Sequence, residues 1–271
     1  METYHKKIIH CLHCKSEDIE YFANTEHGYP RYKCRDCNKT FNQRTGTPFN
    51  RLEIPTDVAL QVVRWYLQYK LSLRDLAKIF QERGIIFTHE TVRNWEKKFT
   101  PLIIKELRRR RYAKAGNSWY IDETVIYVKG KQSYLYRAID RNGQLVDCML
   151  SGKRDMASAK KFFRGAKRFT GRSPKRATTD GLASYPRAIR EVLGKKVLHR
   201  VNSYLINYTE QSHRAIKQRY YPMRGFGNFK SAERICRGFE EVHNFFKPKN
   251  QATCSLKESR RILASKLFSF N

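Results

Sequence analysis

Three acidic side chains stand where an ionised carboxylate needs a partner. Asp122 lies in the middle of residues 118–128, whose β-branched and aromatic side chains predict a buried strand. Asp180 directly follows a second short strand pattern, and Glu210 begins a helical one. An ionised carboxylate inside a fold is costly unless it is paired or binds a metal. In a chain with 55 Lys and Arg residues against 25 Asp and Glu, these three carboxylates indicate a divalent-metal site that acts on phosphate.

Four of the seven cysteines form a second set with metal-binding spacing, Cys11 with Cys14 and Cys34 with Cys37. Two Cys-x-x-Cys pairs supply four thiolates, which complete a tetrahedral zinc site and leave no open position for catalysis. We therefore expect one structural Zn²⁺, and we expect His13, inside the first pair, not to replace a thiolate. Short strand patterns at 21–24, 30–33 and 39–41 are typical of a zinc ribbon.

The formal net charge of +30 implies a polyanionic partner. A ribosomal or histone-like protein is the alternative, but such proteins rarely carry a sheet with buried carboxylates. The sequence has no apolar run of the roughly 18 residues that a transmembrane helix needs, and its polar start lacks the apolar core of a signal peptide. We expect a soluble, intracellular protein without a membrane partner. The basic residues of the ribbon either grip DNA or form a solvated face: Arg31, Lys33, Arg35, Lys39 and Arg44.

Three helical patterns follow, at 56–69, 71–80 and 88–99, with Ser72 as a helix N-cap. Two short helices joined by a tight connection predict a helix-turn-helix; a three-helix packing module without DNA contacts is the alternative. Val92, Trp95 and Phe99 repeat at core spacing. The residues expected at the DNA surface are His89, Glu90, Arg93 and Asn94. The basic run Arg108, Arg109, Arg110 and Arg111 would hold the DNA backbone or remain a solvated face.

Strand and helix patterns then alternate through the rest of the chain. Strands are predicted at 118–128, 132–140, 144–150, 175–179 and 196–198, and helices at 156–169, 184–193 and 231–246. Glu210, His213, Arg214 and Lys217 share one face of a further helix. That face holds either metal and phosphate or ordinary exposed ion pairs. The aromatic and basic stretch 220–230, with Arg224, is suited to gripping a DNA end, although its aromatic rings could instead fill the core.

From about residue 55 to 246, the sequence resembles DDE transposases of insertion sequences, most closely the IS-six family. The motifs that carry the resemblance are 119–124 (Trp-Tyr-Ile-Asp-Glu-Thr), 134–140 (Tyr-Leu-Tyr-Arg-Ala-Ile-Asp), 179–181 (Thr-Asp-Gly) and 210–214 (Glu-Gln-Ser-His-Arg), with 223–226 and 238–240. The resemblance implies a ribonuclease H-like fold whose first and fourth strands are neighbours, which would bring Asp122 and Asp180 together. The interval between Asp180 and Glu210 is somewhat shorter than is usual in this family.

The chemistry implied is phosphoryl transfer with two Mg²⁺ or Mn²⁺ ions held by Asp122, Asp180 and Glu210. His213 and Lys217 would assist at the phosphate, and no covalent protein–DNA intermediate is expected. Strand alternation would turn Glu123 to the opposite face of the sheet, so we exclude it from the metal site. We expect Asp140 to be structural.

We predict an α/β catalytic domain with a mixed five-stranded sheet, preceded by two small DNA-binding modules. The expected segments are a zinc ribbon at 1–45, a linker at 46–54, a helix-turn-helix at 55–112, the catalytic domain at 113–248 and a tail at 249–271. The expected partners are double-stranded DNA (terminal inverted repeats and target DNA) and at least one further copy of the chain. The expected location is the cytoplasm of a bacterium or archaeon, at the nucleoid. The alternatives are an inactive or domesticated DNA-binding relative and a structure-selective nuclease of the same fold.

Overall fold

The computed structural model describes residues 10–26, 28–202, 214–223 and 225–247. These residues form two compact units that divide between Val62 and Val63, inside the first helix. The domain boundaries expected from the sequence stay a prediction, because this division does not separate the helix-turn-helix from the catalytic domain. Within the described part of the chain, every helix is too short or too polar to cross a membrane.

The first unit contains a three-stranded antiparallel sheet. Its strands are β1 (Ile19–Asn24), β2 (Pro30–Cys34) and β3 (Thr40–Asn42), in that order across the sheet. Its small core consists of Cys11, Cys34 and Phe41, with Tyr32 stacked on the Phe41 ring. So small a core buries little apolar area, which is why a domain of this size commonly relies on a metal.

Arg44 lies inside this unit and not on its surface. Its side chain is 7% exposed and donates to the carbonyl oxygens of Leu52, at 2.9 Å, and Ile54, at 3.1 Å. The guanidinium also lies 3.8 Å from the centre of the Tyr29 ring. The prediction that Arg44 grips DNA or belongs to a solvated face is therefore wrong, because its donors hold the following segment against the ribbon.

Three helices follow, α1 (Thr56–Gln68), α2 (Leu73–Gln81) and α3 (His89–Arg111). Ser72 and Asp75 form a reciprocal capping box at the start of α2, as expected for an N-cap serine. Helix α3 is longer than predicted, because it continues through Pro101 to Arg111. Proline removes one backbone donor, but Ile103 and Leu107 are buried beyond it, so packing outweighs the lost hydrogen bond.

The second unit is built on a five-stranded mixed sheet. Its strands are β4 (Ser118–Val128), β5 (Lys131–Asp140), β6 (Leu145–Ser151), β7 (Arg176–Thr179) and β8 (Leu198–Val201). The order is β6-β5-β4-β7-β8, with the first three antiparallel and β7 and β8 parallel to β4. This topology is the predicted ribonuclease H-like arrangement. The fifth strand lies at 198–201 and not at 196–198, because backbone pairing with β7, and not local hydrophobicity, defines it.

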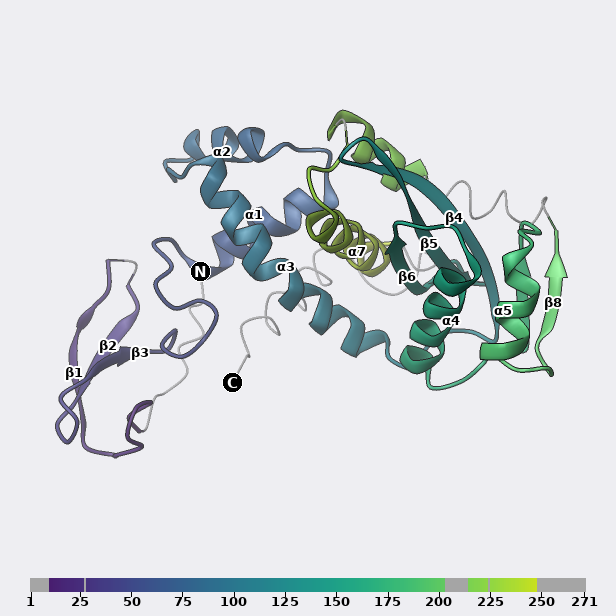
Figure 1. Ribbon diagram of the computed structural model, residues 1–271. Helices are drawn as coiled ribbons and strands as arrows, with labels where there is room; N and C mark the ends of the chain where they lie inside the picture. Colours follow the sequence, from purple (N-terminus) through teal and green to yellow (C-terminus); the bar gives the residue numbers. More distant parts are fainter. Residues whose placement is uncertain (1–9, 27, 203–213, 224, 248–271) are drawn as a thin grey trace. The chain divides into compact units, whose positions relative to one another are not determined.

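Helices cover the sheet on both faces (Figure 1). One face packs on α4 (Met156–Thr170) and α5 (Ser184–Val192), around a core that includes Trp119, Ile121, Phe162, Phe163 and Tyr185. The long helix α7 (Phe229–Phe246) lies against β5 and β6 on the other face, where Glu240 pairs with Arg137 at 2.7 Å. A short 3-10 helix, η1 (Tyr221–Met223), precedes α7.

The backbone around η1 is fastened to the far end of β4. The amide of Tyr127 donates to the hydroxyl of Tyr220 at 2.7 Å, and the amide of Phe226 donates to the carbonyl of Tyr127 at 3.1 Å. The amide of Lys129 in turn donates to the carbonyl of Phe226 at 2.8 Å. These contacts hold the end of the helical residues 214–220 next to the strand that carries Asp122.

Candidate active site and metal centres

The parallel pairing of β4 with β7 positions the first two predicted carboxylates. The register pairs Trp119 with Ala177 and Tyr120 with Thr178. When this register is continued by two residues along both strands, Asp122 lies beside Asp180, which follows the last residue of β7. Their carboxylate oxygens lie within 4.8 Å of one another. The adjacency predicted for these two residues is therefore present in the structure.

Glu123 belongs to the same group of carboxylates. An oxygen of its side chain lies within 4.8 Å of oxygens of both Asp122 and Asp180. The prediction that alternation carries Glu123 away is therefore wrong in its geometry. Alternation separates neighbouring side chains inside a sheet, but Asp180 follows the end of β7, where the sheet no longer separates its two faces.

Arg154, just before α4, lies among these carboxylates. Its guanidinium forms an ion pair with Oε1 of Glu123 and contacts Oδ2 of Asp180 at 3.4 Å. The Arg154 side chain is 41% exposed, whereas that of Glu123 is 3% exposed. Arg154 was not among the residues singled out from the sequence. The only local signal is its position before Asp155, which caps the start of α4 by accepting from the amide of Ser158.

Tyr185 on α5 completes the setting of Glu123. Its hydroxyl donates to Oε2 of Glu123, and its side chain is fully buried. Burial, followed by the charge of Glu123, raises the pKa of Tyr185 well above its usual value, so the hydroxyl stays a donor. The same two causes raise the pKa of Tyr136 to about 12. Both oxygens of Glu123 are therefore engaged.

The turn after Asp180 orients that carboxylate. The amide of Leu182 donates to Oδ1 of Asp180 at 3.1 Å. Between them, Gly181 has a φ of +96°, and a Cβ there would lie 2.9 Å from a methyl group of Val201. Only glycine meets both requirements without strain.

The acidic group fits a hard divalent cation such as Mg²⁺ or Mn²⁺, which prefers carboxylate oxygens. In this structure the guanidinium of Arg154 supplies a positive charge between Glu123 and Asp180. A positive charge at this point indicates that the carboxylates require a cation, as expected for acidic side chains held so close together.

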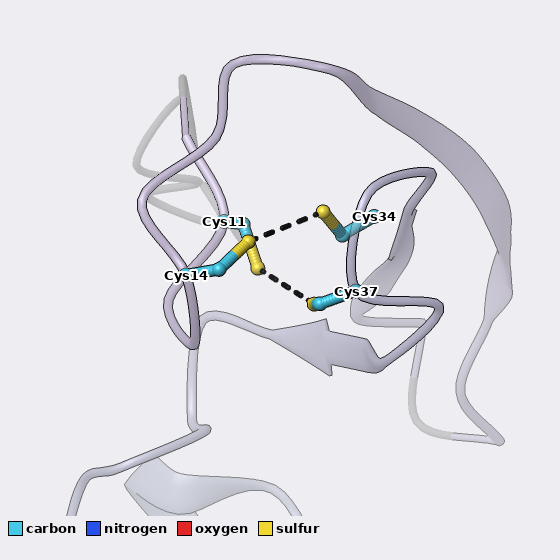
Figure 2. Close-up of side chains that lie close together, drawn as sticks. All are labelled: Cys11, Cys14, Cys34 and Cys37. Carbon is cyan, nitrogen blue, oxygen red and sulfur yellow. Dashed lines mark hydrogen bonds between the residues drawn. The ribbon is translucent and has the colours of Figure 1, made fainter.

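The four predicted zinc ligands meet in the ribbon (Figure 2). Sulfur atoms of Cys14 and Cys34 are 3.5 Å apart, and those of Cys11 and Cys37 are 3.7 Å apart. All four sulfurs lie within 4.8 Å of one another as free thiols. Ligands at about 2.3 Å from a tetrahedral zinc would be separated by about 3.8 Å, so the cluster fits one Zn²⁺.

The remaining residues of the predicted catalytic face are described only in part. Glu210, His213 and Arg224 lie outside the residues that the structure describes. Arg214 is exposed and Lys217 half-buried in the helical residues 214–220. Asp140 is structural, as expected, because its carboxylate accepts from the amides of Gly116, Asn142 and Gln144.

The predicted recognition surface lies at the start of α3. Glu90, Arg93 and Asn94 are exposed and His89 is half-buried, while Val92, Trp95 and Phe99 are buried. Glu90 accepts from Arg93 at 2.7 Å and lies 3.2 Å from His89. The polar face is thus open to a partner, and contact with DNA there remains a prediction.

Three of the four arginines at the end of α3 have less exposure than a solvated run would show. Arg111 donates to both oxygens of Glu241 at 2.5 and 2.6 Å, and Arg108 lies 2.7 Å from Asp147 and 3.2 Å from Glu241. Arg109 and Arg110 pair with Glu106, and of the four only Arg109 is largely exposed, at 67%. The positions of Arg108 and Arg111 favour a structural role over contact with the DNA backbone.

Comparison with known proteins shows which family the chain resembles. Residues 116–249 match a family model described as a DDE domain. The chain is 35% identical over 203 residues to the transposase for insertion sequence-like element IS431mec of Staphylococcus aureus, covering 73% of this chain and 88% of that protein. It is 34% identical, with the same coverage, to the transposase for insertion sequence element IS257 in transposon Tn4003 of the same species.

Solved structures with a similar chain trace include the HTLV-2 integrase catalytic core domain in complex with magnesium. The dimeric form is 14% identical with a TM-score of 0.39, and the match covers 54% of this chain and 97% of that one.

Proposed function

We infer the activity of this chain from its family, because it belongs to the DDE transposases of the IS-six family of insertion sequences. Members of this class are enzymes that transfer DNA strands with the help of a divalent metal. The acidic group in the middle of β4 and just after β7 supplies side chains of the kind that this chemistry requires.

We propose that the chain binds the ends of its insertion sequence and catalyses strand cleavage and strand transfer there. Asp122, Asp180 and Glu210 would hold two Mg²⁺ or Mn²⁺ ions. Two such metal ions would activate the attacking oxygen and stabilise the leaving oxygen in an in-line phosphoryl transfer. The observation that carries the proposal is the approach of Asp122 and Asp180, which the register of two parallel strands brings within 4.8 Å.

The residues of the chain have separate tasks in this proposal. Asp122 and Asp180 provide anionic oxygens, and the amide of Leu182 fixes the orientation of Asp180. His213 and Lys217 would contact the phosphate, with Arg214 and Arg224 on the DNA beside it. The exposed start of α3, with His89, would read the terminal repeat, since the N-terminal part of a recognition helix contacts base edges in the major groove.

The zinc ribbon would be a second DNA-contacting module, held together by one Zn²⁺ at its four cysteines. Two DNA ends must meet for strand transfer, so we propose that the chain works as a homodimer or larger assembly. The target DNA is a third nucleic-acid partner. The formal net charge of +30 suits an assembly that gathers several DNA segments.

Strand cleavage and strand transfer on DNA that carries the element's own ends test the proposal. We expect the parent protein to cut and join this DNA in Mg²⁺, and Asp122→Asn and Asp180→Asn to lose both steps while still shifting the DNA in a gel. Glu191→Gln is the matched control, because Glu191 is a half-exposed carboxylate that pairs with Lys160 and Arg187 away from the group.

Two other results would replace the proposal. Binding without cleavage by the parent protein would make it an inactive DNA-binding relative. Cleavage of branched DNA without joining of ends would make it a structure-selective nuclease.

A further inference from the structure

The geometry points to Arg154 as a cation that the metal displaces from Asp180 and that then contacts the DNA phosphate, with Glu123 as the positioning residue that keeps it at the site. This inference rests on the proposed function, because it takes Asp180 as a metal ligand. It assigns roles to three residues outside the expected set, namely Glu123, Arg154 and Tyr185.

The two contacts of Arg154 are unequal. Its Nε and Nη2 both approach Oε1 of Glu123, whereas only Nη2 reaches Asp180, at 3.4 Å. Charge-assisted hydrogen bonds between nitrogen and oxygen are usually about 2.7–2.9 Å long. The contact with Asp180 is therefore the weaker one, and it breaks first when another cation competes for that oxygen.

Asp180 cannot keep Arg154 and take a metal ion through the same oxygen. Its Oδ1 already accepts from the amide of Leu182, and Oδ2 is the oxygen that Arg154 contacts. A Mg²⁺ ion binds a carboxylate oxygen at about 2.0–2.1 Å, where it repels a guanidinium on that oxygen. The Arg154 side chain is 41% exposed, so it has room to withdraw from Asp180.

Glu123 is a holder of Arg154 and not a ligand of the metal in this account. Each of its oxygens has a partner, Arg154 on Oε1 and the hydroxyl of Tyr185 on Oε2. Its side chain is 3% exposed, and the ring of Tyr185 that holds it is fully buried. If Glu123 bound the metal ion, it would lose its contact with Arg154 or with Tyr185. If Asp180 binds the metal ion, it loses only its long contact with Arg154.

After Arg154 has left Asp180, it remains beside the carboxylates and still has N–H groups that can donate to another anion. A guanidinium has five N–H groups in a planar fork that matches two oxygens of a phosphate. The group that reacts in the proposed function is a phosphate, and it must lie next to the same carboxylates. Arg154 is thus exchanged between an anion of the protein and an anion of the substrate.

Mn²⁺ binding to the zinc-loaded, full-length protein without DNA tests the first half of the inference. Free Mn²⁺ is measured by electron paramagnetic resonance. We expect Arg154→Ala to bind Mn²⁺ several-fold more tightly than the parent, because the competing cation is gone. The matched control is Arg187→Ala, which removes an exposed arginine that pairs with Glu191 on α5, and its Mn²⁺ affinity should equal that of the parent.

Strand transfer at saturating Mn²⁺ tests the second half. We expect the rate of Arg154→Ala to fall by about tenfold or more, as for the loss of a charge-assisted hydrogen bond to the reacting phosphate. Arg154→Lys keeps the positive charge but lacks the planar guanidinium. Its Mn²⁺ affinity should therefore lie between those of the parent and Arg154→Ala, and its rate of strand transfer should stay low. Tighter metal binding together with slower transfer is a combination that a purely structural arginine would not produce.

A double-mutant cycle with Glu123→Gln distinguishes whether Glu123 positions Arg154 or binds the metal ion itself. If Glu123 acts only through Arg154, its substitution lowers the rate in the parent and changes neither rate nor Mn²⁺ affinity in Arg154→Ala. A further loss of Mn²⁺ affinity in the double variant would identify Glu123 as a ligand and overturn the inference. Circular dichroism of each variant confirms that it is folded.

Asp180→Asn in the same two assays distinguishes this inference from the proposed function. If Asp180→Asn keeps Mn²⁺ binding and strand transfer, the proposed metal site itself is wrong. If Asp180→Asn loses both while Arg154→Ala matches Arg187→Ala in both, only the role of Arg154 is wrong.

Discussion

At the scale of single side chains, the buried groups of the described residues depend on their partners. The side chain of Glu123 is nearly inaccessible to solvent, and it keeps a guanidinium on one oxygen and a tyrosine hydroxyl on the other. Cys34 is fully buried, and its sulfur lies 3.5 Å from that of Cys14. A buried carboxylate is costly without a partner, so Glu123 depends on these two contacts. A buried thiol is not costly, so what points to a metal at Cys34 is the approach of its sulfur to other cysteine sulfurs.

Cys34→Ser tests the zinc centre at this scale. We expect the zinc content to fall from one ion per chain to about none, and the ribbon to become open to protease, because a structural zinc contributes directly to folding. Zinc is measured by atomic absorption, and the site of cleavage by mass spectrometry. Cys148→Ala is the control, since Cys148 is a buried free thiol in the second unit. Full zinc content in Cys34→Ser would rule out the four-cysteine site.

The packing of helix α7 depends on its close approach to helices α1 and α3. Among its buried residues are Ala232, Ile235, Gly238 and Phe239, so it packs a continuous apolar face. A Cβ at Gly238 would lie 2.8 Å from Cγ2 of Thr100 on α3 and 3.0 Å from Cδ2 of Leu67 on α1. The glycine therefore sets the distance between α7 and the helices that precede the sheet.

Gly238→Ala should destabilise the protein for this reason. We expect a loss of about 1–3 kcal/mol in the free energy of unfolding, the usual cost of overpacking a core, measured by chemical denaturation. Gly227→Ala is the matched control, because a Cβ there would meet nothing within 4 Å. Equal stability of the two variants would show that α7 shifts without cost and that the close approach is unimportant.

At the scale of the second unit, largely buried ion pairs join α3 to α7 and to the five-stranded sheet. Glu96 on α3 accepts from Arg234 on α7 at 2.7 and 2.9 Å. Farther along α3, Arg111 donates to Glu241 on α7 and to the carbonyl oxygens of Leu145 and Val146 on β6, each at 2.8 Å. These contacts fix the orientation of α3 relative to the sheet, and thus of its exposed start relative to the carboxylates.

Glu241→Gln tests this connection. The Glu241 side chain is fully buried and pairs with both Arg108 and Arg111, whose side chains are 21% and 13% exposed. Neutralising Glu241 removes the counter-charge that these two guanidinium groups share, and among the described residues only Arg108 keeps another acidic partner, Asp147. We expect a loss of about 1.5–3 kcal/mol in the free energy of unfolding, the range for hydrogen bonds to charged groups, because both arginines keep other acceptors. Glu191→Gln, at a more exposed ion pair, should cost less than about 1 kcal/mol. A small effect in both variants would mean that water or neighbouring groups replace the lost charge.

The sequence by itself determined the features that depend on local spacing. The Cys-x-x-Cys pairs predicted the sulfur cluster, the Ser72 cap was confirmed at the start of α2, and the patterns at 118–128 and 156–169 placed a strand and a helix within a residue of their observed bounds. The approach of Asp122 to Asp180 was also expected, but through family resemblance, since spacing along one chain does not show which strands pair.

Only the tertiary structure decided which groups meet across the sheet. It brought Glu123 into the carboxylate group, placed Arg154 between Glu123 and Asp180, and turned Arg108 and Arg111 inward to acidic partners. The physical reason is that periodicity reports which face of its own element a side chain occupies. Where that element ends, and which charge of another element lies opposite, depends on pairing and packing between segments far apart in the chain.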